Sequence, residues 1–194
     1  NKLTIQDLSD AGAQPMHLDN MYHSVVNGEI YNYPILRKEL ERLYGAEFRS
    51  NCDSEIVLHG YKHEGLKFFK RLNGMFAFAL LDEGSGKLHV VRDRAGVKPV
   101  YYVTHGGRFL LASEIKSLFG AINKNDWDID SIALSQYLTY QTTLGERTLF
   151  SNVKQLLPGR ILTLNIGNIN QLTIDKFWVN KKIWFDIQDK EKLF

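Results

Sequence analysis

Two short stretches of the chain combine residues that could bind a polar ligand. Asn27-Gly28-Glu29 joins a side-chain amide, a glycine whose backbone N–H no side chain shields, and a carboxylate. Asp53 supplies a second carboxylate. Carboxylates form charge-assisted hydrogen bonds with ammonium groups, and N–H donors stabilise an oxygen on which negative charge develops. A purely structural interpretation is also open, in which Asn27-Gly28 is a hairpin turn, Glu29 a strand-end charge and Asp53 a helix cap.

Three other groups could do chemistry, and for each the structural interpretation is favoured. Cys52 precedes an expected helix, where a thiol can become reactive, but a small, half-buried residue is the simpler reading. His59 and His63 have the spacing of two metal ligands on one helix face, yet no third ligand is evident, so we expect no metal. The string 92–94, Arg-Asp-Arg, could bind phosphate, but it leads from an apolar strand into a turn and indicates structural ion pairing.

The first half of the chain predicts short strands and helices around these residues. Residues 23–26 suit a strand, Asn27-Gly28 a turn, and residues 29–31 a second short strand. Asn32 can cap a helix that places Leu36, Leu40 and Leu43 on one face and ends near Gly45. Asp53 or Ser54 can cap a second helix, whose core side carries Ile56, Val57, Gly60 and Tyr61, and residues 66–72 suit a third.

The second half predicts an antiparallel sheet followed by a helix and a hairpin. Residues 75–81 are apolar on both alternating faces, which is typical of a strand covered above and below. Strands over 88–91, 100–103 and 109–112 continue a meander, and Ser113 can cap a helix over 114–119. A helix over 130–140 precedes a last hairpin, 160–164 and 171–177, turned at 165–168. The fold class is α+β with antiparallel sheet.

The composition fits one soluble domain with a tail. The 194 residues are 44% apolar, and the net charge of +2 offers no electrostatic footprint for nucleic acid or an anionic membrane. A single cysteine excludes an internal disulfide framework and favours a reducing, cytoplasmic location. No run approaches the roughly 18 apolar residues of a membrane span. The chain enters directly into residues 2–5, an alternating strand-like run, so we expect a segment before it.

Four strings in order resemble the asparagine synthetases, and more broadly the class II glutamine amidotransferase domain of the N-terminal nucleophile hydrolases. They are Asp7-Leu8-Ser9 with Gly12-Ala13-Gln14-Pro15-Met16, Asn27-Gly28-Glu29-Ile30-Tyr31-Asn32, Asp53-Ser54-Glu55, and Arg92-Asp93-Arg94-Ala95-Gly96-Val97-Lys98-Pro99. The resemblance implies a four-layer αββα sandwich of antiparallel sheets, here lacking its first strand. It implies an amidotransferase domain over residues 1–178 and, over 179–194, a linker toward an ATP-dependent synthetase domain.

The resemblance also implies a site for glutamine. The Asn27 side chain and the Gly28 N–H match the family's oxyanion hole, and Glu29 and Asp53 match the groups that hold the α-ammonium. Lys2 stands where the family has an arginine for the α-carboxylate, so the charge is kept but the planar fork is lost. Gln6 matches a substrate contact. The family's nucleophile, an N-terminal cysteine, is absent from this chain, so we expect the fragment to be inactive and the preceding segment to carry it.

The expected activity of the whole protein is hydrolysis of L-glutamine to glutamate and ammonia, which then amidates ATP-activated aspartate in a second domain. ATP and Mg would bind in that domain, and this chain would need no cofactor; a homodimer is possible. Two alternatives stay open. One is an asparagine synthetase-like amidotransferase acting on sugar uronic acids, and the other is a pseudo-glutaminase scaffold. Retention of Asn27, Glu29 and Asp53 together argues against the scaffold.

Overall fold

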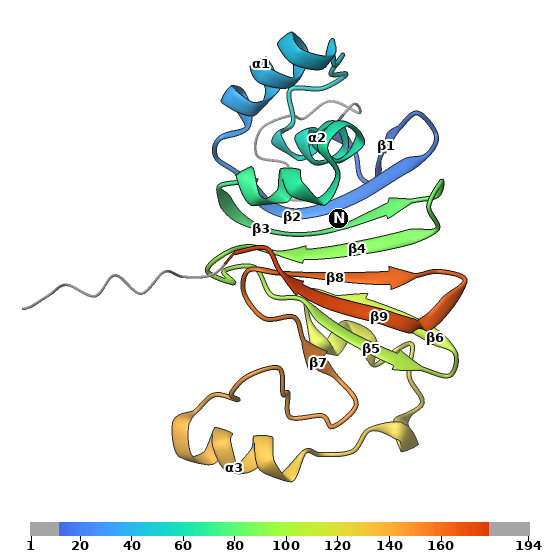
Figure 1. The fold of residues 1–194 in the computed structure, drawn as a ribbon. Coiled ribbons are helices and arrows are strands. Elements are labelled where there is room, and N and C mark those ends of the chain that lie inside the picture. The colour runs from blue at the N-terminus through green and yellow to red at the C-terminus, as the bar shows by residue number, and fades with distance from the viewer. Residues whose placement is uncertain (1–11, 179–194) are drawn as a thin grey trace, which may run out of the picture.

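Two antiparallel β-sheets face each other at the centre of the fold, in a computed structural model that describes residues 12–178 (Figure 1). The larger sheet has the strand order β1-β2-β3-β4-β8-β9 and the smaller one β6-β5-β7. The strands are β1 (Met16–Leu18), β2 (Tyr22–Ile30), β3 (Gly74–Asp82), β4 (Lys87–Arg92), β5 (Tyr101–His105), β6 (Arg108–Ala112), β7 (Lys154–Gln155), β8 (Arg160–Asn165) and β9 (Asn168–Lys176).

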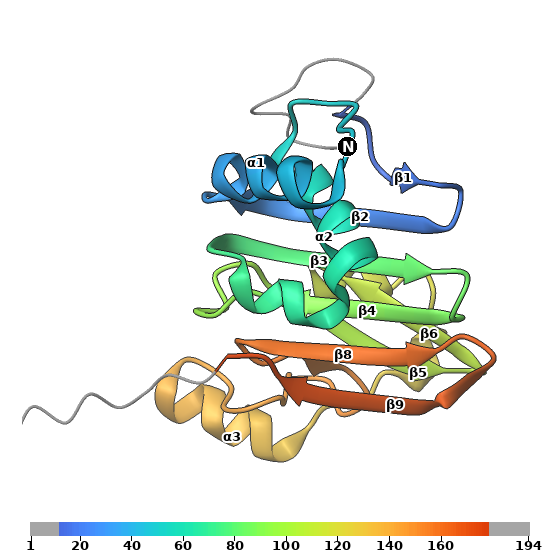
Figure 2. The same cartoon turned by 45° about the horizontal axis from the view of Figure 1, so that its top comes forward.

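Helices lie on both outer sides of the paired sheets. The α-helices are α1 (Tyr33–Tyr44), α2 (Ile56–Glu64) and α3 (Ser131–Tyr140), and short 3₁₀ helices span Asp53–Glu55, Gly65–Arg71, Ile115–Leu118 and Lys124–Asp126. Helices α1 and α2 cover the outer face of the larger sheet, whereas α3 lies beyond the smaller sheet (Figures 1 and 2). The α+β, four-layer prediction is confirmed. In the described part of the chain, no helix is long and apolar enough to cross a membrane.

Apolar side chains fill the spaces between these layers. One cluster lies between the helices and the larger sheet, a second between the two sheets, and a third under the smaller sheet. Strand β3 serves the first two, because Phe76 and Phe78 belong to the helix-side cluster while Ala77 and Ala79 contact the cluster between the sheets. The prediction that this strand is covered on both faces is confirmed.

The predicted turn at Asn27-Gly28 is wrong, because β2 runs unbroken from Tyr22 to Ile30. All nine residues pair with β3, including Asn27 with Ala77 and Gly28 with Phe76. Gly28 has φ +130°, and a Cβ built there would lie 2.0 Å from the Met75 carbonyl oxygen. Long-range pairing therefore overrides the local turn signal, and the glycine permits a backbone approach that no side chain would allow.

Several predicted caps and packing positions also differ. The Asn32 side chain caps no helix and instead bonds the loop before β3, donating to the Arg71 carbonyl and accepting from the Asn73 N–H. Leu36 and Leu40 are buried as expected, but Leu43 is exposed. The helices predicted over 66–72 and 114–119 are the 3₁₀ helices Gly65–Arg71 and Ile115–Leu118, and the Ser113 cap is absent because the second of these begins after Glu114. The strand-like residues 2–5 and the linker 179–194 lie outside the described residues.

A buried polar network ties α2 to three strands of the larger sheet. The Tyr61 hydroxyl lies 3.0 Å from both Asp82 Oδ2 and His89 Nε2, and His89 Nδ1 lies 2.9 Å from Thr163 Oγ1. Burial lowers the pKa of His89 to about 4, and the charge of Lys87 acts in the same direction against the opposing effect of Asp82. The ring is therefore neutral at pH 7 and can both donate and accept within the network.

The low pKa of His89 predicts acid-sensitive folding. As pH falls from 6.5 to about 4, the unfolded chain takes up a proton on this residue that the folded chain resists, so stability drops by up to ~3 kcal/mol. Replacing it in His89→Gln should flatten this part of the profile of unfolding free energy, measured by urea titration between pH 7 and 4. The matched control is His105→Gln, at a partly exposed ring; equal profiles for the two variants would refute the prediction.

The close approach at Gly28 predicts a strong effect of a single methyl group. Gly28→Ala combines an unfavourable backbone conformation with a clash against the Met75 carbonyl, and should destabilise the domain by about 3 kcal/mol or more. Gly45→Ala is the matched control, since Gly45 also has a positive φ but no atom within 4 Å of a built Cβ; its cost should be about 1–2 kcal/mol. The unfolding free energies of the two variants, measured by urea titration, test this prediction, and comparable losses of stability would contradict it.

Candidate functional site

The predicted site residues gather at the carboxyl end of β2. Asn27, Gly28 and Glu29 are consecutive residues of this strand, with Asn27 and Gly28 exposed and Glu29 half-buried. Asp53, at the start of the 3₁₀ helix before α2, accepts a 2.7 Å hydrogen bond from the Ile30 N–H through Oδ2. The structure thus brings both predicted carboxylates to one strand end. Lys2 and Gln6 lie outside the described residues.

Strand β1 pairs only with residues 22–24 of β2. Farther along the same edge of β2, side chains bond to the strand's backbone. The Gln14 amide bonds both polar groups of the Val26 backbone, with each donor–acceptor distance 2.9 Å, and Asp53 takes the Ile30 N–H. Because backbone N–H groups alternate between the two edges of a strand, the Gly28 N–H points to the same edge, between these two contacts. The Gly28 N–H is therefore a hydrogen-bond donor on this edge, and the N–H groups of Val26 and Ile30 on either side of it are already bonded.

An apolar groove of about 330 Å³ opens beside Asn27, between the two sheets. Its lining is Val25, Asn27, Ala77, Phe78, Ala79, Val90, Pro99, Val100, Leu111, Ala112 and Ser113. The side-chain amide of Asn27 is one of only two polar side chains in that lining. A polar group bound at the end of β2 would therefore lie at the mouth of a low-polarity space, where hydrogen bonds to a developing charge are strong.

The loop before α2 buries Cys52 and Asp53 together. Their side chains are 4% and 5% exposed, and Cys52 Sγ lies 3.6 Å from Asp53 Oδ1. Ser54 Oγ lies 3.4 Å from the same oxygen. The predicted helix cap by Asp53 or Ser54 is wrong, since no side-chain cap bond is made at either helix start and Asp53 serves the β2 backbone instead. Cys52 is more buried than the half-buried position predicted for it.

Glu55 holds this loop in place, a role that the sequence did not indicate. Its carboxylate accepts hydrogen bonds from the Arg49 N–H (2.8 Å), the Ser50 N–H (2.9 Å) and the Ser50 hydroxyl (2.6 Å). Burial alone would raise the pKa of Glu55, but the nearby His59 side chain, Ser50 and the two backbone donors outweigh it and lower the pKa to about 2. A charged Glu55 thus fixes the residues that lead into Asp53.

The string 92–94 is structural, as interpreted, but its contacts are hydrogen bonds to backbone and not ion pairs. Arg92 donates to the carbonyls of Lys98 (2.8 Å), Leu156 (2.6 Å) and Gly96 (2.8 Å). The fully buried Asp93 accepts from the N–H groups of Ala95, Val97 and Lys98. Within residues 12–178, neither side chain makes a salt bridge. The pair therefore shapes the loop that ends at Pro99, one wall of the groove.

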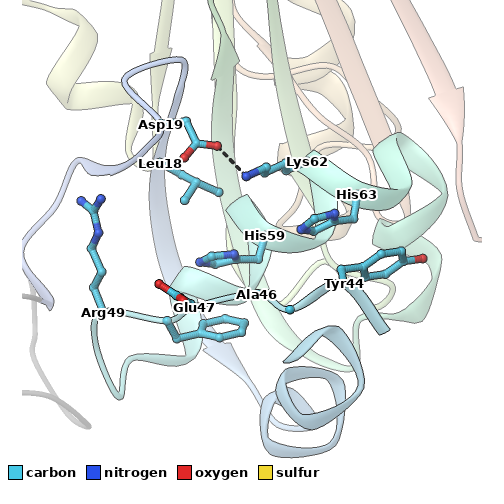
Figure 3. Close-up of a pocket in the computed structure, with 11 residues that line it drawn as sticks. Leu18, Asp19, Tyr44, Ala46, Glu47, Arg49, His59, Lys62 and His63 are labelled. Carbon is cyan, nitrogen blue, oxygen red and sulfur yellow. Dashed lines mark ion pairs between the residues drawn. The ribbon is translucent and has the colours of Figure 1, made fainter. Parts of the chain in front are cut away.

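A second pocket, of about 360 Å³, lies at the far end of α2 and contains none of the predicted site residues (Figure 3). His59 and His63 both line it, beside an ion pair between Lys62 and Asp19 (2.7 Å). His59 is buried, with Nε2 3.4 Å from Glu55 Oε1, and the His63 ring stacks on Tyr44. Among the described residues, no group of three or more His, Cys, Asp or Glu side chains could hold a metal ion.

The contacts of Glu55 predict a cost for neutralising it. Glu55→Gln keeps the shape but replaces one carboxylate oxygen with an NH₂ group, which must face either the Arg49 N–H or the two Ser50 donors, so stability at pH 7 should fall by about 2–3 kcal/mol. The wild type should lose this contribution as pH falls from 4.5 toward 2, and the variant should lack that step. Glu47→Gln, at an exposed position in the same loop, is the control in urea unfolding. Equal losses of stability in the two variants would refute the role given to Glu55.

Two solved structures share the fold of this chain. The B. subtilis glutamine phosphoribosylpyrophosphate amidotransferase, complexed with ADP and GMP, aligns with TM-score 0.57 and 21% identity, over 86% of this chain and 32% of that one. A structure described as the allosteric regulatory enzyme of purine biosynthesis aligns with TM-score 0.58 and 19% identity, over 90% and 34%. At these identities the likeness establishes the fold alone.

Curated sequences are more similar. Glutamine-hydrolysing asparagine synthetase 1 of Bacillus subtilis (strain 168) is 39% identical over 163 residues, which cover 84% of this chain and 25% of the relative. Amidase chry2 of Gibberella zeae is 38% identical over 162 residues, covering 83% and 23%. The chain therefore spans about a quarter of the length of these relatives. A family model described as a glutamine amidotransferase domain matches residues 1–178, and the chain therefore belongs to the glutamine amidotransferase domain family.

Proposed function

We propose that this chain is the glutaminase domain of a glutamine-dependent asparagine synthetase. In this proposal the whole protein hydrolyses L-glutamine, and the ammonia amidates ATP-activated aspartate in a second domain. The observation that carries the proposal is the end of β2, where an exposed side-chain amide, an edge-facing glycine N–H and two carboxylates lie together beside an apolar groove. The glutamine-hydrolysing asparagine synthetase of B. subtilis, at 39% identity, supports the choice of acceptor.

The oxyanion formed on the glutamine side chain would be held by Asn27 and Gly28. Attack on the amide carbon turns its carbonyl into an oxyanion, and two N–H donors at hydrogen-bond distance stabilise that charge, each by a few kcal/mol of barrier. The Asn27 amide can supply one donor and the Gly28 N–H the other. Pairing of β2 with β3, with Gly28 opposite Phe76, holds this backbone in place, so the donor needs little reorganisation.

The α-ammonium group of glutamine would be held by Glu29 and Asp53. Asp53 Oδ2 accepts from the Ile30 N–H, and Cys52 Sγ and Ser54 Oγ lie near Oδ1. A carboxylate has about four acceptor positions, so about one remains for a ligand. Glu29 precedes Ile30 on the strand. Two negative groups around one ammonium give charge-assisted hydrogen bonds worth roughly 1.5–3 kcal/mol each. In this proposal Lys2 binds the α-carboxylate, and Gln6 supplies a further contact to the substrate.

The nucleophile, ATP and Mg are assigned to parts of the protein other than this chain. Cys52, the single cysteine, is buried against Asp53 and is not exposed at the groove. The sequence contains no Ser-Gly-Gly-x-Asp-Ser loop for pyrophosphate, and the described residues hold no acidic cluster suited to a divalent cation. This chain would therefore bind and orient glutamine without hydrolysing it.

Calorimetric titration with L-glutamine tests the proposal. The folded chain should bind glutamine saturably and release no ammonia. Asp53→Asn keeps an acceptor for the Ile30 N–H but removes the charge, so affinity should fall at least about tenfold, which corresponds to ~1.4 kcal/mol. Asp126→Asn, at an exposed acid on another layer, is the matched control and should bind as the wild type does.

The outcomes separate the proposal from its rivals. Loss of binding in Asp53→Asn alone supports a glutamine site at the end of β2. A folded chain that binds no glutamine would favour a scaffold without glutaminase function. Equal affinity in Asp53→Asn and Asp126→Asn would remove Asp53 from the site, with circular dichroism of each variant confirming that the fold is intact.

A further inference from the structure

We propose that helix α3 is the docking element for the remainder of the polypeptide, the synthetase domain of the proposed function. The helix and its flanks expose an unusual number of large apolar side chains. Leu138 is 76% exposed, Tyr140 62% and Ile132 53%. Others in the same region are Ile129, Leu134, Tyr137 and Leu144. Contiguous exposed apolar surface on a soluble domain marks an interaction site.

The composition of α3 is that of a buried helix. None of its ten residues is charged, and Ala133 is its one buried side chain. A helix that is apolar on most sides is normally enclosed by protein, and interface centres are depleted of charge and rich in aromatic residues. A ten-residue helix is also too short to be stable by propensity alone. The helix therefore has the features of an interface core.

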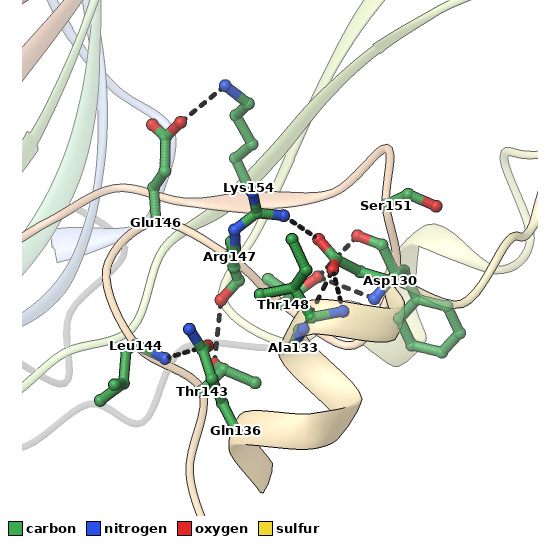
Figure 4. Close-up of polar contacts among 12 residues, drawn as sticks. Asp130, Ala133, Gln136, Thr143, Leu144, Glu146, Arg147, Thr148, Ser151 and Lys154 are labelled. Carbon is green, nitrogen blue, oxygen red and sulfur yellow. Dashed lines mark hydrogen bonds and ion pairs between the residues drawn. The ribbon is translucent and has the colours of Figure 1, made fainter.

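Polar contacts of Asp130 and Gln136 help to hold α3 in place (Figure 4). Asp130 caps its first turn, accepting from the N–H groups of Ile132 and Ala133 at 3.0 Å, and pairs with Arg147 at 2.5 Å. The side chain of Gln136 accepts from the Leu144 N–H at 3.0 Å. These contacts fix the position of the helix while its apolar side chains stay available to a partner.

The partner is argued from the directions of those side chains and from the lengths of the relatives. Successive helical residues are about 100° apart, so Ile132, Tyr137 and Leu138 point to different sides of α3. A two-fold contact with a second copy covers the same single patch on each and would leave some of them exposed. A surface that encloses the helix covers them all. The curated relatives, about four times as long as the matched region, contain enough additional chain to form it.

Chemical labelling of the full-length protein tests whether α3 is covered. Leu138→Cys and Ile35→Cys place thiols at positions of similar exposure in this domain, 76% and 64%. We expect the cysteine at position 138 to react with a maleimide at least tenfold more slowly than the cysteine at position 35, with labelled peptides quantified by mass spectrometry. Equal rates overturn the proposal. Protection that disappears on dilution also overturns it, because it indicates a second copy.

Photo-crosslinking identifies what covers the helix. With p-benzoylphenylalanine in place of Leu138, crosslinks should map to residues beyond this chain in the same polypeptide. Crosslinks to residues 179–194, or crosslinked dimers, overturn the assignment. The inference rests on the two-domain protein of the proposed function but not on its glutaminase step. Ammonia release from glutamine, measured on the same samples, therefore tests the proposed function separately, since either result can fail while the other holds.

Discussion

The candidate site depends on the buried hydrogen bond from the Ile30 N–H to the Asp53 carboxylate. This bond joins the helical layer to the edge of β2, and it satisfies a strand N–H that β1 is too short to reach. The loop that carries Asp53 is in turn fixed by the charged Glu55. Burying a carboxylate is costly unless hydrogen bonds compensate for its lost hydration. The geometry of the proposed ammonium site is thus set by polar contacts made before any ligand binds.

The architecture followed from apolar periodicity, whereas the conformation at Gly28 did not. The pattern of β3, apolar on both faces, predicted its central position because burial on either side depends on residue type alone. Asn27-Gly28 gave a turn signal because local conformational preference is all that a dipeptide encodes. In the structure, nine paired residues of β3 supply hydrogen bonds that outweigh that preference. Leu43 is exposed although its spacing matches that of the buried Leu36 and Leu40, because helical spacing alone does not say where the covering surface ends.

The site residues could be named from the sequence only through family resemblance, and the residues that position them could not be named at all. Asn27, Gly28 and Glu29 stand in a recognisable string. Gln14 and Glu55 also lie within matched strings, but their contacts are with the backbone of Val26 and of residues 49–50. A side chain that bonds to backbone groups does not require any particular residue type at the position it contacts. The sequence therefore does not indicate which residues Gln14 and Glu55 bind.

The proposed site and α3 lie in different layers of the fold, which constrains how the proposed protein could work. The site is at the end of β2 in the larger sheet, and α3 lies beyond the smaller sheet (Figure 1). Between them is the groove that begins at Asn27 and reaches Val100 and Leu111 of the smaller sheet region. Neutral ammonia loses far less solvation free energy than ammonium does on entering an apolar space. A second domain docked on α3 would therefore be separated from the glutamine site by a layer that favours the uncharged product.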